Sequence, residues 1–193
     1  MSSPEFNGQA ERGLRRPATG ELSAPGPRCP PRSVASPSGP PPALLVIGYG
    51  NTLRRDDGVG PKVVEALAAL QLPGVQTLIC QQLSPEHADP ISRADTVVFV
   101  DAAVDAPKGV QWRRLAPSAS AQLMAHAADP RTILALARDV FGHTPCAWWL
   151  TIPAVAMGFG EDLSPVAQRG GAKAVALISA LVRSRNLSTA AAP

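Results

Sequence analysis

The sequence contains no long hydrophobic segment and no closely spaced pair of cysteines. No apolar run approaches the roughly 20 residues that a membrane-crossing helix needs, so we expect no membrane association. Cys29, Cys80 and Cys146 form no C-x-x-C pair, which argues against a structural zinc site or a dithiol redox centre. Cys80 and Cys146 lie in apolar runs and are expected to be buried free thiols. A soluble protein of the reducing cytoplasm fits these features.

The folded part of the chain lacks the basic charge of a nucleic-acid-binding protein. The formal net charge is +3, but residues 1–42 hold five Arg and three Glu, which leaves only +1 for all that follows. Nucleic-acid binding needs a basic stripe on the domain itself. We therefore expect no nucleic-acid partner.

Two common types of catalytic or cofactor-binding motif are also missing. The sequence has no G-x-S-x-G elbow, and no cysteine has a histidine beside it. The G-Y-G at residues 48–50 resembles a dinucleotide-binding turn, but Leu53 stands where a third glycine is needed. The acids that follow would repel a pyrophosphate, and residues 80–82 offer no acid for a ribose. No nucleotide cofactor is expected.

Composition divides the chain into three parts. Residues 1–42 contain ten of the 21 prolines and no apolar periodicity, so they cannot bury enough surface to offset their ordering entropy. We expect a disordered tail over residues 1–42, one folded domain over 43–183, and a flexible C-terminus over 184–193.

Strand and helix patterns alternate through residues 43–183. Asp129 and Ser164 are expected to be helix N-caps, each followed by a proline at the first helical position, and Gly142 is expected to stop the helix after Asp129. Helices between strands produce parallel β-α-β units, and residues 109–116 suggest one antiparallel edge strand reached by a hairpin. The sequence thus predicts a three-layer α/β/α sandwich with a mostly parallel sheet of about five strands. The expected strands are 43–48, 75–80, 96–103, 109–116 and 146–153, and the main helices begin near 61, 85, 130 and 165.

Three polar side chains fall where such a sheet binds ligands, beyond the carboxyl ends of its strands. Asp57 lies in the turn after the first strand, Asp101 ends the third strand, and His126 precedes the helix that Asp129 caps. Two carboxylates and an imidazole suit a borderline divalent metal such as zinc, nickel or iron. Three protein ligands also leave an open position for a substrate.

Ordinary structural roles compete with this interpretation. An aspartate after a strand is often a helix cap or a solvated turn residue, and a single histidine near a helix start is often simply exposed. Asp101 is harder to explain in that way, because it ends the most apolar strand of the chain, where an unpaired charge is costly.

Residues 48–61 read GYGNTLRRDDGVGP. This stretch resembles the signature of the hydrogenase maturation proteases, which trim the C-terminal extension from the large subunit of NiFe hydrogenases. VVFVDAA at 97–103, the histidine followed by an LALA-type helix, and GFGEDLSP at 158–165 extend the resemblance over residues 43 to about 183. The family has an α/β/α fold with a twisted five-stranded sheet.

The resemblance implies a function and a set of site residues. Asp57 and Asp101 are the expected catalytic residues, and with His126 they are the expected metal ligands; His87 is a rival third ligand. The metal is expected to be the nickel of a hydrogenase large-subunit precursor, the partner of a monomeric enzyme. The alternative is a non-catalytic nickel-binding accessory protein of hydrogenase assembly. The substrate-binding turn is expected to include Gly48, Gly50, Asn51, Asp56 and Gly58.

Overall fold

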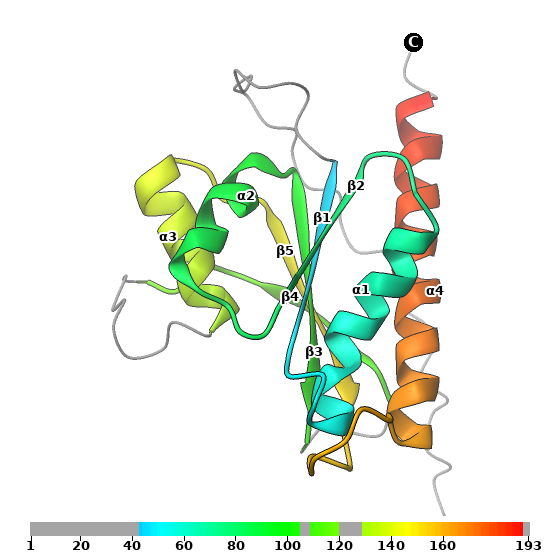
Figure 1. Ribbon diagram of the computed structural model, residues 1–193. Coiled ribbons are helices and arrows are strands. Elements are labelled where there is room, and N and C mark those ends of the chain that lie inside the picture. Colours follow the sequence, from blue (N-terminus) through cyan, green and yellow to red (C-terminus); the bar gives the residue numbers. More distant parts are fainter. Residues whose placement is uncertain (1–42, 105–108, 120–128, 191–193) are drawn as a thin grey trace, which may run out of the picture.

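The computed structural model describes residues 43–104, 109–119 and 129–190, which form an α/β structure (Figure 1). Four of the five strands form where an apolar run with β-branched residues lies between turn residues, whereas the strand at 111–115 reads QWRRL. The expected strands at 75–80, 96–103 and 146–153 are confirmed at those bounds. In chain order the elements are β1 (Leu44–Tyr49), η1 (Arg55–Gly58), α1 (Val59–Ala69), β2 (Val75–Cys80), η2 (Pro85–His87), α2 (Ala88–Arg93), β3 (Thr96–Ala103), β4 (Gln111–Leu115), α3 (Pro130–Phe141), β5 (Cys146–Pro153) and α4 (Pro165–Ala190).

The strands form one five-stranded sheet in the order β2-β1-β3-β5-β4. All neighbours are parallel except β4, which runs antiparallel to β5 at one edge. The predicted fold class is therefore confirmed, but the predicted hairpin is wrong, because β5 lies between β3 and β4. The buried Leu150 and Ile152 of β5 favour an interior position, whereas the exposed Arg113 and Arg114 suit β4 to the edge.

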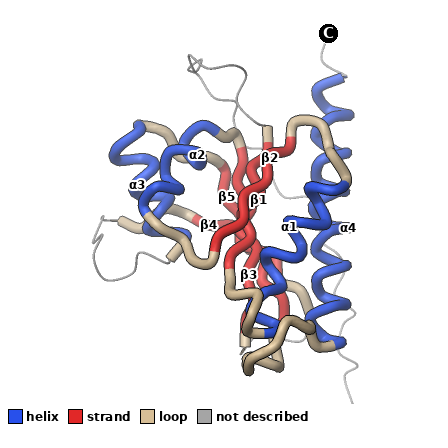
Figure 2. The backbone as a smooth tube through the Cα atoms, in the orientation of Figure 1, coloured by secondary structure: helices blue, strands red, loops and turns tan. Residues whose placement is uncertain are grey.

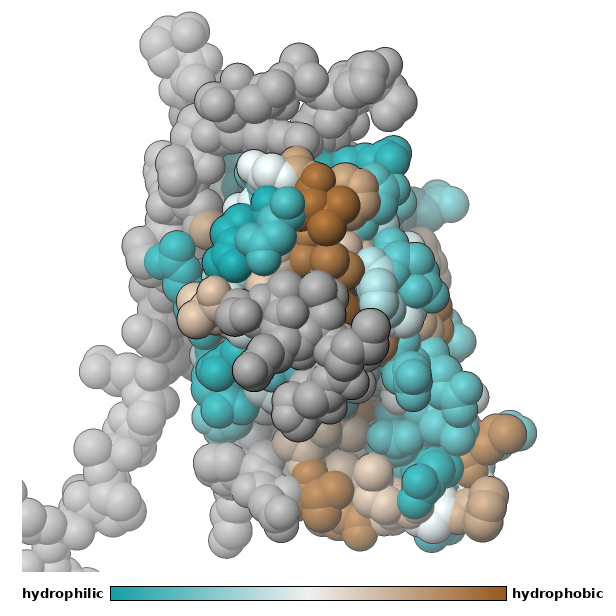
Figure 3. Space-filling model, turned by 90° about the vertical axis from the view of Figure 1, so that its left-hand side faces the viewer, coloured by the Kyte–Doolittle hydropathy of each residue, from teal (hydrophilic) through white to brown (hydrophobic). Residues whose placement is uncertain are grey.

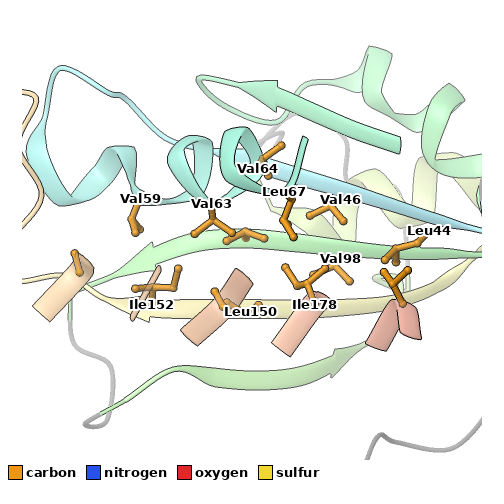
Figure 4. Close-up of a cluster of buried hydrophobic side chains, with 14 residues drawn as sticks. Leu44, Val46, Val59, Val63, Val64, Leu67, Val98, Leu150, Ile152 and Ile178 are labelled. Atoms are coloured by element: carbon orange, nitrogen blue, oxygen red, sulfur yellow. The ribbon is translucent and has the colours of Figure 1, made fainter. Parts of the chain in front are cut away.

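Helices cover both faces of the sheet, as Figures 1 and 2 show, with α1 and α4 on one side and α2 and α3 on the other. Side chains along β1 and β3 alternate between the two cores: Val46 and Val98 pack beneath α1 and α4, whereas Ile47 and Phe99 pack beneath α2 and α3. Figure 4 shows the first of these cores. Because both faces of these strands are buried, their sequences are almost entirely apolar.

The helix ends follow local capping rules. The Asp129 carboxylate accepts a hydrogen bond from the Arg131 N–H at 2.8 Å, and Gly142 ends α3 in the left-handed conformation. The Ser164 hydroxyl accepts from the Ala167 N–H at 3.2 Å, which caps α4. Both predicted caps are confirmed. Helix α4 continues to Ala190, beyond residue 183, where we expected the domain to end.

Some large apolar side chains lie on the surface of the protein. Val140 and Phe141, at the end of α3, are exposed, and Figure 3 shows apolar groups among the polar ones on the face that α2 and α3 form.

Cys80 is a free thiol, but Cys146 is disulfide-bonded, so the expectation of free thiols is confirmed for Cys80 and wrong for Cys146. Within the described ranges, no helix combines the length and apolar character that crossing a bilayer requires.

Candidate active site

The carboxyl ends of β1, β3 and β5 meet at one edge of the sheet, the lower edge in Figure 1. The turn after β1 carries Asp57, and Asp101 lies near the end of β3. The register pairs Gly48 of β1 with Val100 of β3, so Tyr49 and Asp101 are the next residues along these neighbouring strands. Topology alone thus brings side chains from two separate segments to this edge.

The Asp57 turn is a tight loop, held together by hydrogen bonds from its backbone N–H groups to its own side chains. Gly50 has φ +136°, a conformation that side-chain-bearing residues rarely adopt, and a Cβ there would overlap the Asp57 carbonyl oxygen. The Asn51 N–H donates to Oδ2 of Asp57 at 2.9 Å, and Oδ1 of Asn51 accepts from the Leu53 N–H at 2.9 Å. At Gly58, a Cβ would lie 2.8 Å from Cα of Thr52. Asp57 is therefore fixed at the edge while its side chain stays partly exposed.

Asp101 is a half-buried carboxyl group with a perturbed acidity. Its pKa is raised to about 6, chiefly by burial and to a smaller extent by the negative charge of Asp57, against the opposing effect of hydrogen bonds from Tyr49 and from the Ala102 N–H. Asp57 and Asp101 thus lie at the same edge of the sheet, and the charge of Asp57 contributes to the raised pKa of Asp101. Two like charges held at one edge form a natural site for a cation.

Tyr49 and Trp149 surround Asp101, and the sequence patterns did not identify either. The Tyr49 hydroxyl donates to Oδ2 of Asp101 at 2.9 Å. Burial, reinforced by the charge of Asp101, raises the pKa of Tyr49 far above its ordinary value, so the phenol stays a donor. Nε1 of Trp149 is buried and makes no hydrogen bond of normal geometry among the described residues, but as a donor near Asp101 it favours the carboxylate form and lowers the pKa of Asp101. The strand register, once known, would have located both residues.

We expect Tyr49→Phe to raise the pKa of Asp101 above 6 by about one unit, because the lost hydrogen bond stabilises the carboxylate form. Carbon-detected NMR titration of the Asp101 side chain measures this change. Trp112→Phe is the matched control, since Trp112 packs against Trp148 beneath α4, on the other face of the sheet. An unchanged pKa in Tyr49→Phe would contradict the assignment of the phenol as the donor that matters.

Asp56 behaves differently from its neighbour Asp57. We expected it in a substrate-binding turn, but it is fully buried, and donors from residues 155–164 occupy its carboxylate. Burial alone would raise the pKa of Asp56, but hydrogen bonds from Ser164, Val155 and Ala156 hold that pKa below its ordinary value. The two adjacent acids therefore have different surroundings: Asp56 is buried between the loops, and Asp57 lies partly exposed at the carboxyl edge of the sheet.

The two candidate histidines are placed unequally. His126 lies outside the described residues, so its role as a ligand stays a prediction. The described chain resumes at Asp129, just before α3. The charge of Asp129 contributes to the raised pKa of Tyr49, so the start of α3 lies near this edge. His87 is buried, and its Nδ1 accepts from the Ser84 N–H at 2.9 Å in a capping box.

The described residues supply two carboxylates at the edge and no third ligand. Among them, no group of three or more His, Cys, Asp or Glu side chains is placed to hold a metal ion. The structure therefore does not bring His87 together with Asp57 and Asp101. Carboxylate oxygens are ligands that a divalent cation accepts.

Proteins of known structure share this architecture, although no protein-family model and no curated protein sequence matches the chain. The NiFe hydrogenase maturation protease HycI from Thermococcus kodakarensis KOD1 aligns with a TM-score of 0.60 at 22% identity, over 76% of this chain and 95% of that chain. The hydrogenase maturating endopeptidase HybD from Escherichia coli aligns with a TM-score of 0.59 at 22% identity, over 74% and 93%.

The fold and the candidate site together define a class of protein: an α/β/α protein with two acidic residues at the carboxyl ends of its parallel strands. A third structure, HybD from Thermococcus kodakarensis, aligns with a TM-score of 0.56 at 22% identity, over 72% of this chain and 98% of that chain. The chain thus has the fold of the hydrogenase maturation proteases over nearly their whole length.

Proposed function

We propose that this protein is a hydrogenase maturation endopeptidase. It removes the C-terminal extension from the large-subunit precursor of a NiFe hydrogenase after nickel has been inserted. Asp57, Asp101 and His126 recognise the nickel that the precursor carries, so only a loaded precursor is cut. The metal belongs to the substrate.

The observation that carries this proposal is the pairing of Asp57 with Asp101 at one edge of the sheet. The two acids come from separate segments, and the charge of one raises the pKa of the other. Such a pair is unfavourable alone and becomes favourable when a divalent cation lies between its members. The fold shared with HycI and HybD supports the same function.

The residues at this edge can assist peptide hydrolysis. In the reaction a water molecule adds to the scissile carbonyl carbon, the C–N bond breaks, and the departing nitrogen takes up a proton. A carboxylate beside the bond can accept the proton of the attacking water and return it to that nitrogen. Asp101, with a pKa of about 6, is mostly ionised at pH 7.5 and is basic enough for this role, and the Tyr49 hydroxyl fixes its orientation.

We expect the purified protein to shorten the nickel-loaded precursor and to leave the nickel-free precursor intact. Intact-mass spectrometry of the two precursors measures this difference. Asp57→Asn keeps the shape of the side chain but removes its negative charge, so cleavage of the loaded precursor should fall at least about 100-fold. The matched control is Asp139→Asn, which makes the same change at the exposed ion pair with Arg138 near the end of α3.

Each alternative outcome has a distinct meaning. Equal cleavage of both precursors would refute recognition through nickel and leave a peptidase. Retained binding without cleavage under any condition would instead favour the accessory protein. A normal rate in Asp57→Asn would remove this residue from the site.

A further inference from the structure

Two segments that are about a hundred residues apart in sequence lie side by side at the carboxyl edge. The Arg55 N–H donates to the Gly160 carbonyl oxygen at 2.7 Å, and the Gly160 N–H donates to the Leu53 carbonyl oxygen at 2.9 Å. The Asp56 N–H donates to the Ala156 carbonyl oxygen at 2.9 Å. In Figures 1 and 2 the loop that follows β5 accordingly packs against the start of α1.

The Asp56 side chain is the centre of this contact. Its Oδ2 accepts hydrogen bonds from the Val155 N–H at 2.8 Å, the Ala156 N–H at 2.9 Å and the Ser164 hydroxyl at 2.8 Å. Its Oδ1 accepts from the Ser164 N–H at 2.6 Å. A buried carboxylate is costly unless its lone pairs are satisfied, and here four donors from one segment satisfy them.

Part of the apolar surface of these segments stays in solvent. Leu53, Val155 and Phe159 are 57%, 67% and 93% exposed, whereas Leu163 packs partly against the core beneath α1 and α4. The hydrogen bonds to Asp56 therefore contribute much of the order of the exposed part of this loop. Removal of the Asp56 charge should therefore loosen residues 154–164 and the turn that carries Asp57.

We propose that Asp56 is a positioning residue, which clamps residues 154–164 onto the turn after β1 and thereby fixes Asp57 for contact with substrate. The clamp is a property of the fold, while its catalytic consequence rests on the proposed function. Asp56 and Asp57 thus have separate tasks: the inner acid holds the loops, and the outer acid meets the substrate.

The test is Asp56→Asn in the full chain, with two readouts. Asn must place an amide NH₂ against backbone donors, so we expect the Val155, Ala156 and Ser164 amides to exchange hydrogen at least about tenfold faster, with the Val98 and Phe99 amides of β3 unchanged. With nickel-loaded precursor, KM should rise at least about tenfold while kcat falls less. A misplaced Asp57 weakens substrate binding, whereas a smaller folded fraction lowers apparent kcat alone.

Asp162→Asn is the matched control, because Asp162 is an exposed acid in the same segment and should change neither readout. If Asp56→Asn fails to fold, Ser164→Ala removes the hydroxyl donor to Asp56 together with the cap on the Ala167 N–H, and should speed exchange at Val155 and Ala156 by a smaller factor. Unchanged exchange in these variants would overturn the clamp, and an unchanged KM with reduced kcat would overturn the positioning role. Failure of the wild-type protein to cut any precursor would refute the proposed function, while hydrogen exchange would still decide the clamp.

Discussion

Asp101→Asn is expected to abolish processing while making the protein more stable at neutral pH. In the folded chain the pKa of Asp101 is about 6, compared with an ordinary value of 3.8, because burial and the charge of Asp57 disfavour the ionised form. A raised carboxyl pKa means that the ionised group destabilises the fold above pH 6, and that this cost disappears as the pH falls toward 4. Asn carries no charge and can still accept the Tyr49 hydrogen bond, so the substitution should add about 1–3 kcal/mol at pH 7.5.

Urea denaturation at pH 7.5 and at pH 4 measures this effect, with cleavage of the nickel-loaded precursor assayed in parallel. The gain in unfolding free energy should be present in full at pH 7.5 and much smaller at pH 4, where Asp101 is protonated in the folded chain and close to half-protonated in the unfolded chain. Asp162→Asn is the control for a general effect of charge removal. An equal gain at both pH values would contradict an origin in the titration of Asp101.

Gly48→Ala is expected to have the largest effect on stability. A Cβ at Gly48 would overlap the carbonyl oxygen of Gly60 and lie 2.7 Å from Cγ2 of Val64, so β1 and α1 could not keep their present separation. Backbone atoms cannot swing aside as a flexible side chain can. We expect a loss of about 3 kcal/mol or more, which corresponds to a fall in Tm of about 6–12 °C.

Thermal unfolding followed by circular dichroism measures the loss. Gly158→Ala is the matched control, because a Cβ at Gly158 meets nothing within 4 Å, and its Tm should stay within about 1–2 °C of the wild type. A similar Tm for both variants would show that the contact between β1 and α1 adjusts more easily than its geometry indicates.

Local chemistry allowed much of the fold to be read from the sequence. The strands at 75–80, 96–103 and 146–153 follow from β-branched apolar runs between turn residues, and Asp129 and Ser164 are caps that act over two and three residues. The position of Asp57 and Asp101 at the carboxyl edge follows from the alternation of strands and helices. These features depend on neighbours in sequence or on a general rule of parallel sheets.

Tertiary structure decided the features that depend on partners far along the chain. β4 pairs with β5 rather than with β3, because strand order reflects which surfaces become buried together. Asp56 and Asp57 look alike in the sequence, yet only the loop at 154–164 determines that the first is buried against four donors and the second faces the edge. Tyr49 and Trp149 likewise meet Asp101 through strand register, which fixes contacts that no local pattern encodes.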